Sequence, residues 1–206
     1  MKPVTIAIAG CGSRGLNCYA RLQKRFPDRM KVVAAADLKP ERLEKARAEY
    51  GLDPDMCFTT AEEMLSSEKL ADAVFVCTLD GDHYAHATAA LRAGYHLLLE
   101  KPISPNEEEC IEIRRLAEEK GLNVVVCHVL RYTVFYQKIK ELIDGGAVGD
   151  LTAIQATEGV AWWHQAHSYV RGNWRRREGG SPMVQIGRAP RLNSSHPSRS
   201  RMPSSA

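Results

Sequence analysis

What this 206-residue chain lacks already excludes several classes of protein. No apolar run reaches the ~18 residues that a membrane-spanning helix needs. The N-terminus has neither the apolar segment nor the cleavage site of a secretion signal, and no Gly-x-y or heptad repeat indicates a fibre. With 44% hydrophobic and 26% charged residues, the composition is that of a globular protein. We therefore expect a soluble globular protein that neither crosses nor binds a membrane.

The six cysteines lack the spacing of a metal or disulfide framework. None of them forms a C-x-x-C pair, and most lie in apolar runs. This distribution is typical of small buried side chains in a reducing compartment. We therefore expect a cytoplasmic protein without a structural metal.

The chain also lacks an excess of one charge outside its C-terminal end. The formal net charge is +3, but four of the 28 basic residues lie after Gly187, where no acid is found. The remaining 24 basic residues face 25 acids. A balanced chain of this kind gives no reason to expect nucleic acid or an anionic membrane as a partner.

Short apolar runs alternate with helical patterns through the first 129 residues. Helices are expected over 13–26, from Pro40 to Gly51, after a capping box at Thr60 and Glu63, over 83–93, and from a start formed by Ser104, Pro105 and Glu107 to Gly121. The last of these should turn Ile111, Ile113, Leu116 and Ala117 inward. Strands are expected over 3–9, 31–36, 57–58, 73–78, 96–99 and 123–129. This order predicts an α/β fold with a doubly wound parallel sheet, a Rossmann domain over residues 1–129.

The pattern changes after Arg131. A helix over 134–143 and an alternating strand over 151–158 predict the beginning of a second domain over residues 130–183, built on a different sheet. Residues 188–206 contain six serines, three prolines and no aromatic residue, so they cannot bury enough surface to fold. We expect residues 184–206 to be a disordered tail of non-native sequence and the second domain to be incomplete; a natural disordered tail is the alternative.

The segment Gly10-Cys11-Gly12-Ser13-Arg14-Gly15 stands between the first strand and the first helix. Its glycines suit a tight turn, close approach of the backbone to a pyrophosphate, and close packing of helix on strand. Asp37 ends the second strand, 22 residues beyond Gly15. A carboxylate there accepts hydrogen bonds from the adenosine ribose and repels a 2′-phosphate, which favours NAD over NADP. Arg14 and Lys39 are nearby cations, so NADP stays possible.

Further segments carry a resemblance to a known family. They are the glycine segment, Asp37, Thr78-x-Asp80-x-x-His83, Ala93-Gly94, Glu100-Lys101-Pro102, and Arg131-Tyr132 followed by residues 145–149. Together they resemble the Gfo/Idh/MocA oxidoreductases over residues 4 to about 183. Leu79 departs from the family, which usually has proline there.

The resemblance implies a Rossmann domain followed by an α/β domain whose open antiparallel sheet often mediates homo-oligomerisation. It implies hydride transfer between NAD(P) and a sugar, cyclitol or related polyol. By position it places Thr78, Asp80 and His83 on the nicotinamide side, with Arg131 also at the cofactor. It places Glu100, Lys101 and Pro102 by the nicotinamide ribose and substrate, with Lys101 as the catalytic lysine. Pro102 is often cis in the family.

A polar-aromatic stretch after the expected strand suggests a polyol pocket. The candidate substrate residues are Tyr132, Glu158, Trp163, His164 and His167. Aromatic faces can contact C–H surfaces of a polyol and imidazoles can bond its hydroxyls; a surface loop with packed tryptophans is an equal alternative. We do not expect His164 and His167 to bind a metal, because no further ligand stands at a familiar spacing.

Two other functions stay open. The family's later Asp-x-x-x-His segment is not found in this sequence, so the chain can be an NAD-binding module without catalysis. Redox-assisted glycoside cleavage or epimerisation with a retained NAD is the second alternative.

Overall fold

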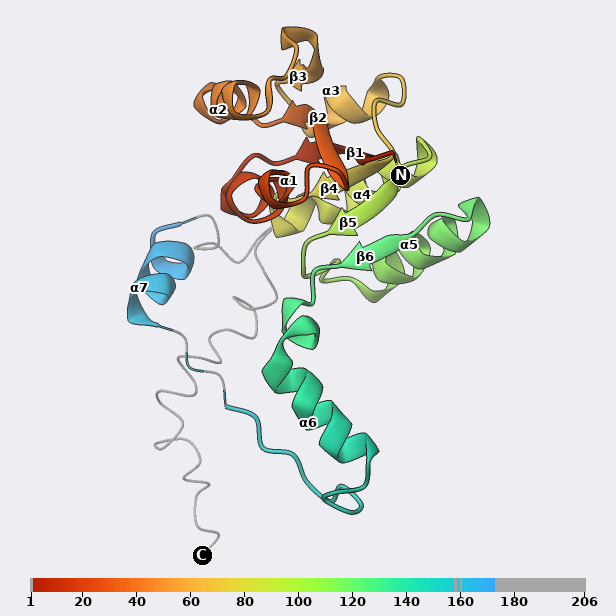
Figure 1. Cartoon of the computed structure of the whole chain (residues 1–206), viewed down its shortest axis with the longest axis vertical. Coiled ribbons are helices and arrows are strands. Elements are labelled where there is room, and N and C mark those ends of the chain that lie inside the picture. The colour runs from red at the N-terminus through yellow and green to blue at the C-terminus, as the bar shows by residue number, and fades with distance from the viewer. Residues whose placement is uncertain (1, 158, 160, 173–206) are drawn as a thin grey trace, which may run out of the picture. The chain divides into compact units, whose positions relative to one another are not determined.

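The computed structural model describes residues 2–157, 159 and 161–172 (Figure 1). The chain divides into two compact units, one that ends at Cys127 and one that begins at His128. None of the helices in these residues is long and apolar enough to cross a membrane.

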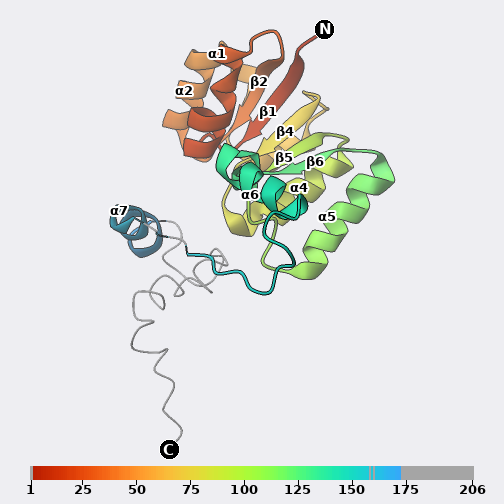
Figure 2. The same cartoon turned by 60° about the horizontal axis from the view of Figure 1, so that its bottom comes forward.

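The first unit is built on a six-stranded sheet, in which every strand pairing is parallel. The strand order is β3-β2-β1-β4-β5-β6, and Figure 2 shows β1, β4, β5 and β6 side by side. This order confirms the predicted Rossmann sheet. The strands are β1 (Val4–Ala9), β2 (Met30–Ala36), β3 (Cys57–Phe58), β4 (Ala73–Val76), β5 (His96–Leu99) and β6 (Val124–Val126).

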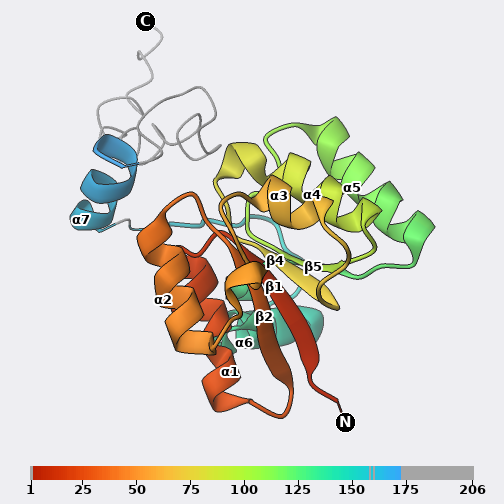
Figure 3. The ribbon, with the colours of Figure 1, turned by 90° about the horizontal axis from the view of Figure 1, so that it is seen from above.

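Helices cover both faces of the sheet (Figure 3). On one face lie the helical segment η1 (Ser13–Ala20), α1 (Leu22–Arg25) and α2 (Pro40–Tyr50). On the other face lie α3 (Ala61–Ser66), α4 (His83–Arg92) and α5 (Glu107–Lys120). The single turns η2 (Pro54–Met56) and η3 (Asp80–Asp82) join strands to helices.

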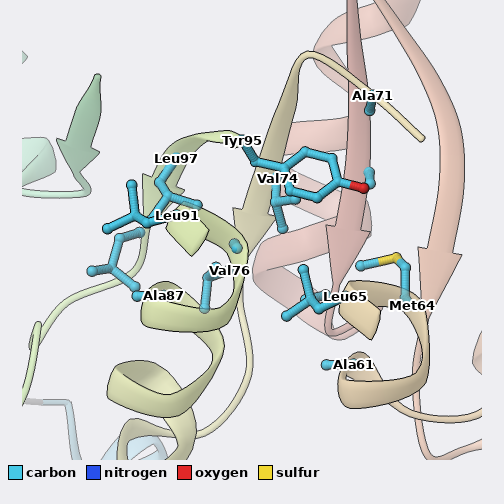
Figure 4. Close-up of a cluster of buried hydrophobic side chains, with 14 of the residues drawn as sticks. Ala61, Met64, Leu65, Ala71, Val74, Val76, Ala87, Leu91, Tyr95 and Leu97 are labelled. Atoms are coloured by element: carbon cyan, nitrogen blue, oxygen red, sulfur yellow. The ribbon is translucent and has the colours of Figure 1, made fainter. Parts of the chain in front are cut away.

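Each face has its own apolar core. In the larger one, Met64 of α3 and Leu91 of α4 pack with Val74 and Val76 of β4, all of them fully buried (Figure 4). Burying each such side chain contributes roughly 1.5–3 kcal/mol before entropic costs. The sequences of the strands are nearly continuous apolar runs because helices cover the sheet on both faces.

Local signals place the helix ends as predicted. Thr60 Oγ1 accepts a hydrogen bond from the Glu63 N–H at 3.0 Å, and the Glu63 carboxylate accepts one from the Thr59 N–H at 3.1 Å. Gly51 and Gly121 end α2 and α5 with φ of 63° and 62°, a left-handed conformation that favours glycine.

Two predictions for this unit are wrong in detail. The helix expected over 13–26 is divided: Arg21 N–H bonds the Leu16 carbonyl at 3.2 Å, five residues back, and a short α1 follows to Arg25. Ile111, expected to point inward, is 57% exposed. The stripe of α5 that meets the core runs through Ile113 and Ala117, and Ile111 lies off that stripe.

The second unit contains η4 (Val129–Tyr132), α6 (Val134–Asp144), α7 (Trp162–His164) and η5 (Gln165–Val170). The helix expected over 134–143 is therefore present. The strand expected over 151–158 is not: residues 151–157 form no strand, and Glu158 lies outside the described residues. A strand needs a neighbouring ladder for its backbone N–H and C=O groups, and residues 128–157 hold no other strand. The expected tail, residues 184–206, also lies outside the described part.

Candidate functional site

The predicted cofactor residues of the first unit lie at one edge of the sheet. Gly10 directly follows β1, Asp37 directly follows β2, Glu100 directly follows β5, and Thr78 lies two residues after the end of β4. Because all strands are parallel, their carboxyl ends meet at this edge. The chain order reverses between β1 and β4, and ligands of such sheets bind at that switch point.

The fold itself requires glycine at two positions of the turn after β1. Gly10 has φ +95°, and a Cβ there would lie 2.5 Å from the Cys77 carbonyl oxygen. A Cβ on Gly15 would lie 2.0 Å from the Gly10 carbonyl oxygen. These two glycines let the turn touch β4 and let η1 pack on β1.

Gly12 is different, because the fold does not require a glycine there. Its φ is −76°, and the nearest atom to an added Cβ is Nη1 of Arg42 at 3.7 Å. The backbone at Gly12 is therefore open to close approach from outside the chain. Ser13 and Arg14, which follow at the start of η1, are exposed.

Asp37 directs its carboxylate at the glycine turn. The residue is 8% exposed, and its Oδ2 accepts a hydrogen bond from the Cys11 N–H at 2.8 Å. Its Oδ1 accepts from the Lys39 N–H at 2.9 Å. Arg42 Nη1 stands 3.4 Å from Oδ2. Arg42 was not among the predicted site residues, and its position in the first turn of α2 gives no signal of this contact.

The thiol beside this carboxylate is neutral. Burial, with Asp37 as the next largest cause, raises the pKa of Cys11 to about 12. Cys11 therefore lines the turn as an apolar group. Among the described residues no group of three or more His, Cys, Asp or Glu side chains could hold a metal ion.

Thr78, at the end of β4, is held through both of its oxygens by α4. His83 Nε2 lies 3.2 Å from the Thr78 carbonyl oxygen, and His86 Nδ1 lies 3.0 Å from its hydroxyl. The other ring nitrogen of His83 contacts the Pro102 carbonyl at 2.6 Å, which links the loops after β4 and β5. Asp80, in the same loop as Thr78, is buried. His86 was not among the predicted site residues.

Glu100 is a buried carboxylate with donors on several sides. Its Oε2 accepts from the Lys101 N–H at 3.1 Å, and the Tyr19 hydroxyl donates to Oε1. Arg14 Nε lies 3.7 Å from the same oxygen. Burial, together with hydrogen bonds to Cys127 and Glu100, raises the pKa of Tyr19, so its hydroxyl stays a donor. Tyr19 was missed because it comes from η1, 81 residues before Glu100.

Lys101 is exposed beside this buried acid. The Lys101–Pro102 peptide bond is cis, as the family resemblance implies. The edge thus presents the exposed Lys101 side chain next to a carboxylate that the fold holds in place.

The remaining candidates belong to the second unit. Arg131 and Tyr132 lie in η4, and Tyr132 is 68% exposed. The rings of Trp163 and His164 meet edge to face at 5.5 Å between centroids. His167 is exposed on η5. The role of Arg131 at the cofactor stays a prediction, as do the roles of Tyr132, Trp163, His164, His167 and Glu158 at a substrate.

A family model described as "Oxidoreductase family, NAD-binding Rossmann fold" matches residues 4–128. The chain is 30% identical over 176 residues to scyllo-inositol 2-dehydrogenase (NADP(+)) IolW of Bacillus subtilis, covering 85% of this chain and 46% of that protein. It is 26% identical to inositol 2-dehydrogenase of Gluconacetobacter diazotrophicus, over 73% of this chain and 44% of the relative.

Among solved structures, scyllo-inositol dehydrogenase from Lactobacillus casei with bound NAD(H) and scyllo-inositol superposes with a TM-score of 0.66 and 28% identity. The match covers 73% of this chain and 44% of that one. The chain thus spans less than half the length of the relatives it matches.

Proposed function

Because this chain belongs to the Gfo/Idh/MocA oxidoreductases, a family with an NAD-binding Rossmann fold, we propose that it binds a nicotinamide dinucleotide and serves the oxidoreduction of a polyol or sugar. The relatives named above are inositol dehydrogenases, which supports this class of substrate.

The observation that carries the proposal is the glycine at position 12. Among the described residues no contact requires a glycine there, since its φ is −76° and the one described atom within 4 Å of an added Cβ is Arg42 Nη1, at 3.7 Å. A ligand that must touch the backbone does need it. A pyrophosphate at the start of η1 is such a ligand, because main-chain N–H groups at a helix N-terminus bind phosphate oxygens.

Asp37 supports the adenosine side of the same site. It lies next to the turn, with Oδ2 2.8 Å from the Cys11 nitrogen. A carboxylate there can accept hydrogen bonds from ribose hydroxyls, which favours NAD. Arg42, 3.4 Å from Oδ2, offsets part of this charge, so we propose NAD as the main cofactor and NADP as a weaker one.

A bound nicotinamide dinucleotide supplies hydride acceptance or donation. The chain's own residues would orient the reactants and move a proton. We assign binding on the nicotinamide side to Thr78, with Asp80 and His83 shaping its loop. The Glu100 carboxylate accepts hydrogen bonds from the Tyr19 hydroxyl and from the Lys101 N–H. These bonds fix the loop that carries Lys101. Lys101 would hold or remove the proton of the substrate hydroxyl.

The cofactor assignment is tested with Gly12→Ala. We expect the variant to keep the wild-type free energy of unfolding and to weaken NAD binding about tenfold or more, since a methyl group replaces close backbone approach. Isothermal titration with NAD and urea denaturation measure the two quantities. Cys18→Ala, at an exposed position of the same segment, is the control. Wild-type NAD affinity in Gly12→Ala would contradict the proposal.

The assignment of Lys101 is tested separately. In protein that reduces NAD with a polyol, Lys101→Ala should lower turnover about 100-fold or more, the usual contribution of a positioned acid or base, and leave NAD affinity unchanged. Steady-state NADH formation and NAD titration are the measurements. Unchanged turnover would remove Lys101 from the mechanism.

We also propose that the protein works in the cytoplasm and self-associates. The cysteines of the chain are all free, which suits a reducing compartment. Self-association rests on the family resemblance alone, and light scattering after size-exclusion chromatography tests it.

A further inference from the structure

Two histidines one helical turn apart on α4 contact the two oxygens of Thr78. His83 Nε2 is 3.2 Å from the carbonyl oxygen, and His86 Nδ1 is 3.0 Å from Oγ1. His83 is 1% exposed and His86 is 5% exposed. Both oxygen atoms of Thr78, the carbonyl and the hydroxyl, are therefore in fixed contacts at this edge of the sheet.

The second nitrogen of His86 reaches a different helix. Nε2 lies 2.9 Å from Oε1 of Glu62, in the first turn of α3. The Glu62 side chain is 71% exposed. Its hydrogen bond to His86 lowers the pKa of this carboxyl, so it is ionised near neutral pH and can only accept.

These contacts determine which atoms of Glu62, His86 and Thr78 carry a proton. An ionised Glu62 that only accepts requires a proton on His86 Nε2. In the neutral ring Nδ1 is then an acceptor, so the Thr78 hydroxyl donates to it. The hydroxyl proton of Thr78 is used within the protein, and the lone pairs of Oγ1 stay available.

We propose that His86, fixed by Glu62, is a positioning residue that presents the Thr78 hydroxyl to the cofactor as a hydrogen-bond acceptor only. The ligand group it would take is an N–H or O–H donor of the nicotinamide nucleoside, either its carboxamide or its ribose. This inference rests on the proposed function, because it assumes a nicotinamide dinucleotide at this edge. A pre-oriented acceptor costs less ordering entropy on binding than a freely rotating hydroxyl.

A purely structural role for His86, tying α4 to α3, is the competing interpretation. A double-mutant cycle separates the two. We expect Thr78→Val and His86→Leu each to weaken NAD binding about 3- to 10-fold, the range of one hydrogen bond. If His86 acts through Thr78, the double variant binds NAD no more weakly than Thr78→Val. Effects that multiply in the double variant, or wild-type affinity in Thr78→Val, overturn the proposal.

A variant at the exposed residue Glu62 tests the same contact without a change to a buried side chain. Glu62→Ala removes the partner of His86, whereas Glu63→Ala removes the neighbouring acid, which contacts Thr59 and not His86. Both variants take one acid from the first turn of α3. Glu62→Ala should weaken NAD binding relative to Glu63→Ala, and equal affinities contradict a role for the Glu62–His86 contact. His86→Gln can donate to Glu62 and accept from Thr78, so it should bind NAD better than His86→Leu.

The proton position is measurable without any cofactor. Nitrogen-15 NMR of the labelled full chain should show His86 protonated at Nε2 and unprotonated at Nδ1. A proton on Nδ1 overturns the proposal. If the chain fails to bind NAD while this tautomer is found, the proposed function fails and the hydrogen-bond order stands, so the two failures are distinguishable.

Discussion

The two units of the chain differ in how far their apolar side chains are buried. In the unit that ends at Cys127, side chains such as Val76 and Leu91 are fully buried between the sheet and its helices. In the unit that begins at His128, Val134 is 83% exposed, Phe135 67% and Leu142 42%. Burial of apolar surface is the main favourable term in folding. The stability of the described chain therefore resides mostly in the first unit.

The candidate site residues of the two units differ in burial in the same way. In the first unit Asp37, His83 and Glu100 are buried and hold fixed partners. In the second unit Tyr132 and Trp163 are 68% and 60% exposed. Reactive groups need supporting contacts to keep their geometry. The cofactor candidates Asp37, His83 and Glu100 are thus held in place by contacts within the first unit.

The largest expected effect comes from one substitution made in a helix of each unit. Leu91→Ala removes a fully buried side chain of α4 and should lower the free energy of unfolding by about 2–5 kcal/mol. Leu142→Ala makes the same chemical change in α6, where the side chain is 42% exposed, and should cost about 1 kcal/mol or less. Urea denaturation followed by circular dichroism measures both. Equal losses would break the contrast between the units.

A smaller effect is expected from glycine substitutions that sharpen the same contrast. Gly15→Ala places a Cβ 2.0 Å from the Gly10 carbonyl oxygen and should destabilise the first unit by roughly 1–3 kcal/mol through overpacking. Gly159→Ala, in the second unit, places a Cβ that meets no atom of the described residues within 4 Å and is the control. Thermal unfolding compares the two. A Gly15→Ala protein with wild-type stability would show that η1 can move away from β1.

Features decided within a few residues could be predicted from the sequence. The strands of the first unit, the cap at Thr60 and the left-handed ends at Gly51 and Gly121 depend on local composition. Residues 151–157 show the limit of such patterns: they alternate as a strand should, but a strand also needs a neighbour, which no local pattern supplies.

Contacts between distant residues could not be predicted. Tyr19 and Glu100 are 81 positions apart, and Glu62 and His86 are 24 apart. Only the packing of η1 near β5 and of α3 against α4 brings these side chains together. Motifs in the sequence indicate the candidate ligand-binding residues, whereas Tyr19, Glu62 and His86, which contact these candidates or support them, belong to no such motif.

The smallest expected effect is a dependence of stability on pH, and it belongs to the first unit. Asp72 Oδ2 accepts hydrogen bonds from the Thr5 N–H at 2.8 Å and its hydroxyl at 2.7 Å, which joins the start of β1 to β4. The hydrogen bond from the Thr5 N–H is the largest cause of a shift, and the bond from the Thr5 hydroxyl is the next. Both lower the pKa of this exposed carboxyl below its usual value. A lowered folded-state pKa contributes stability above the unfolded pKa of about 4, and this contribution is lost as the pH falls through the folded pKa.

The free energy of unfolding should therefore fall less for Asp72→Asn than for the wild type between about pH 5 and pH 2. Asp150→Asn, at an exposed acid of the second unit, should follow the wild-type curve. Denaturation at stepped pH measures the three curves. Parallel curves for the wild type and Asp72→Asn would show that the Thr5 contact does not couple to folding.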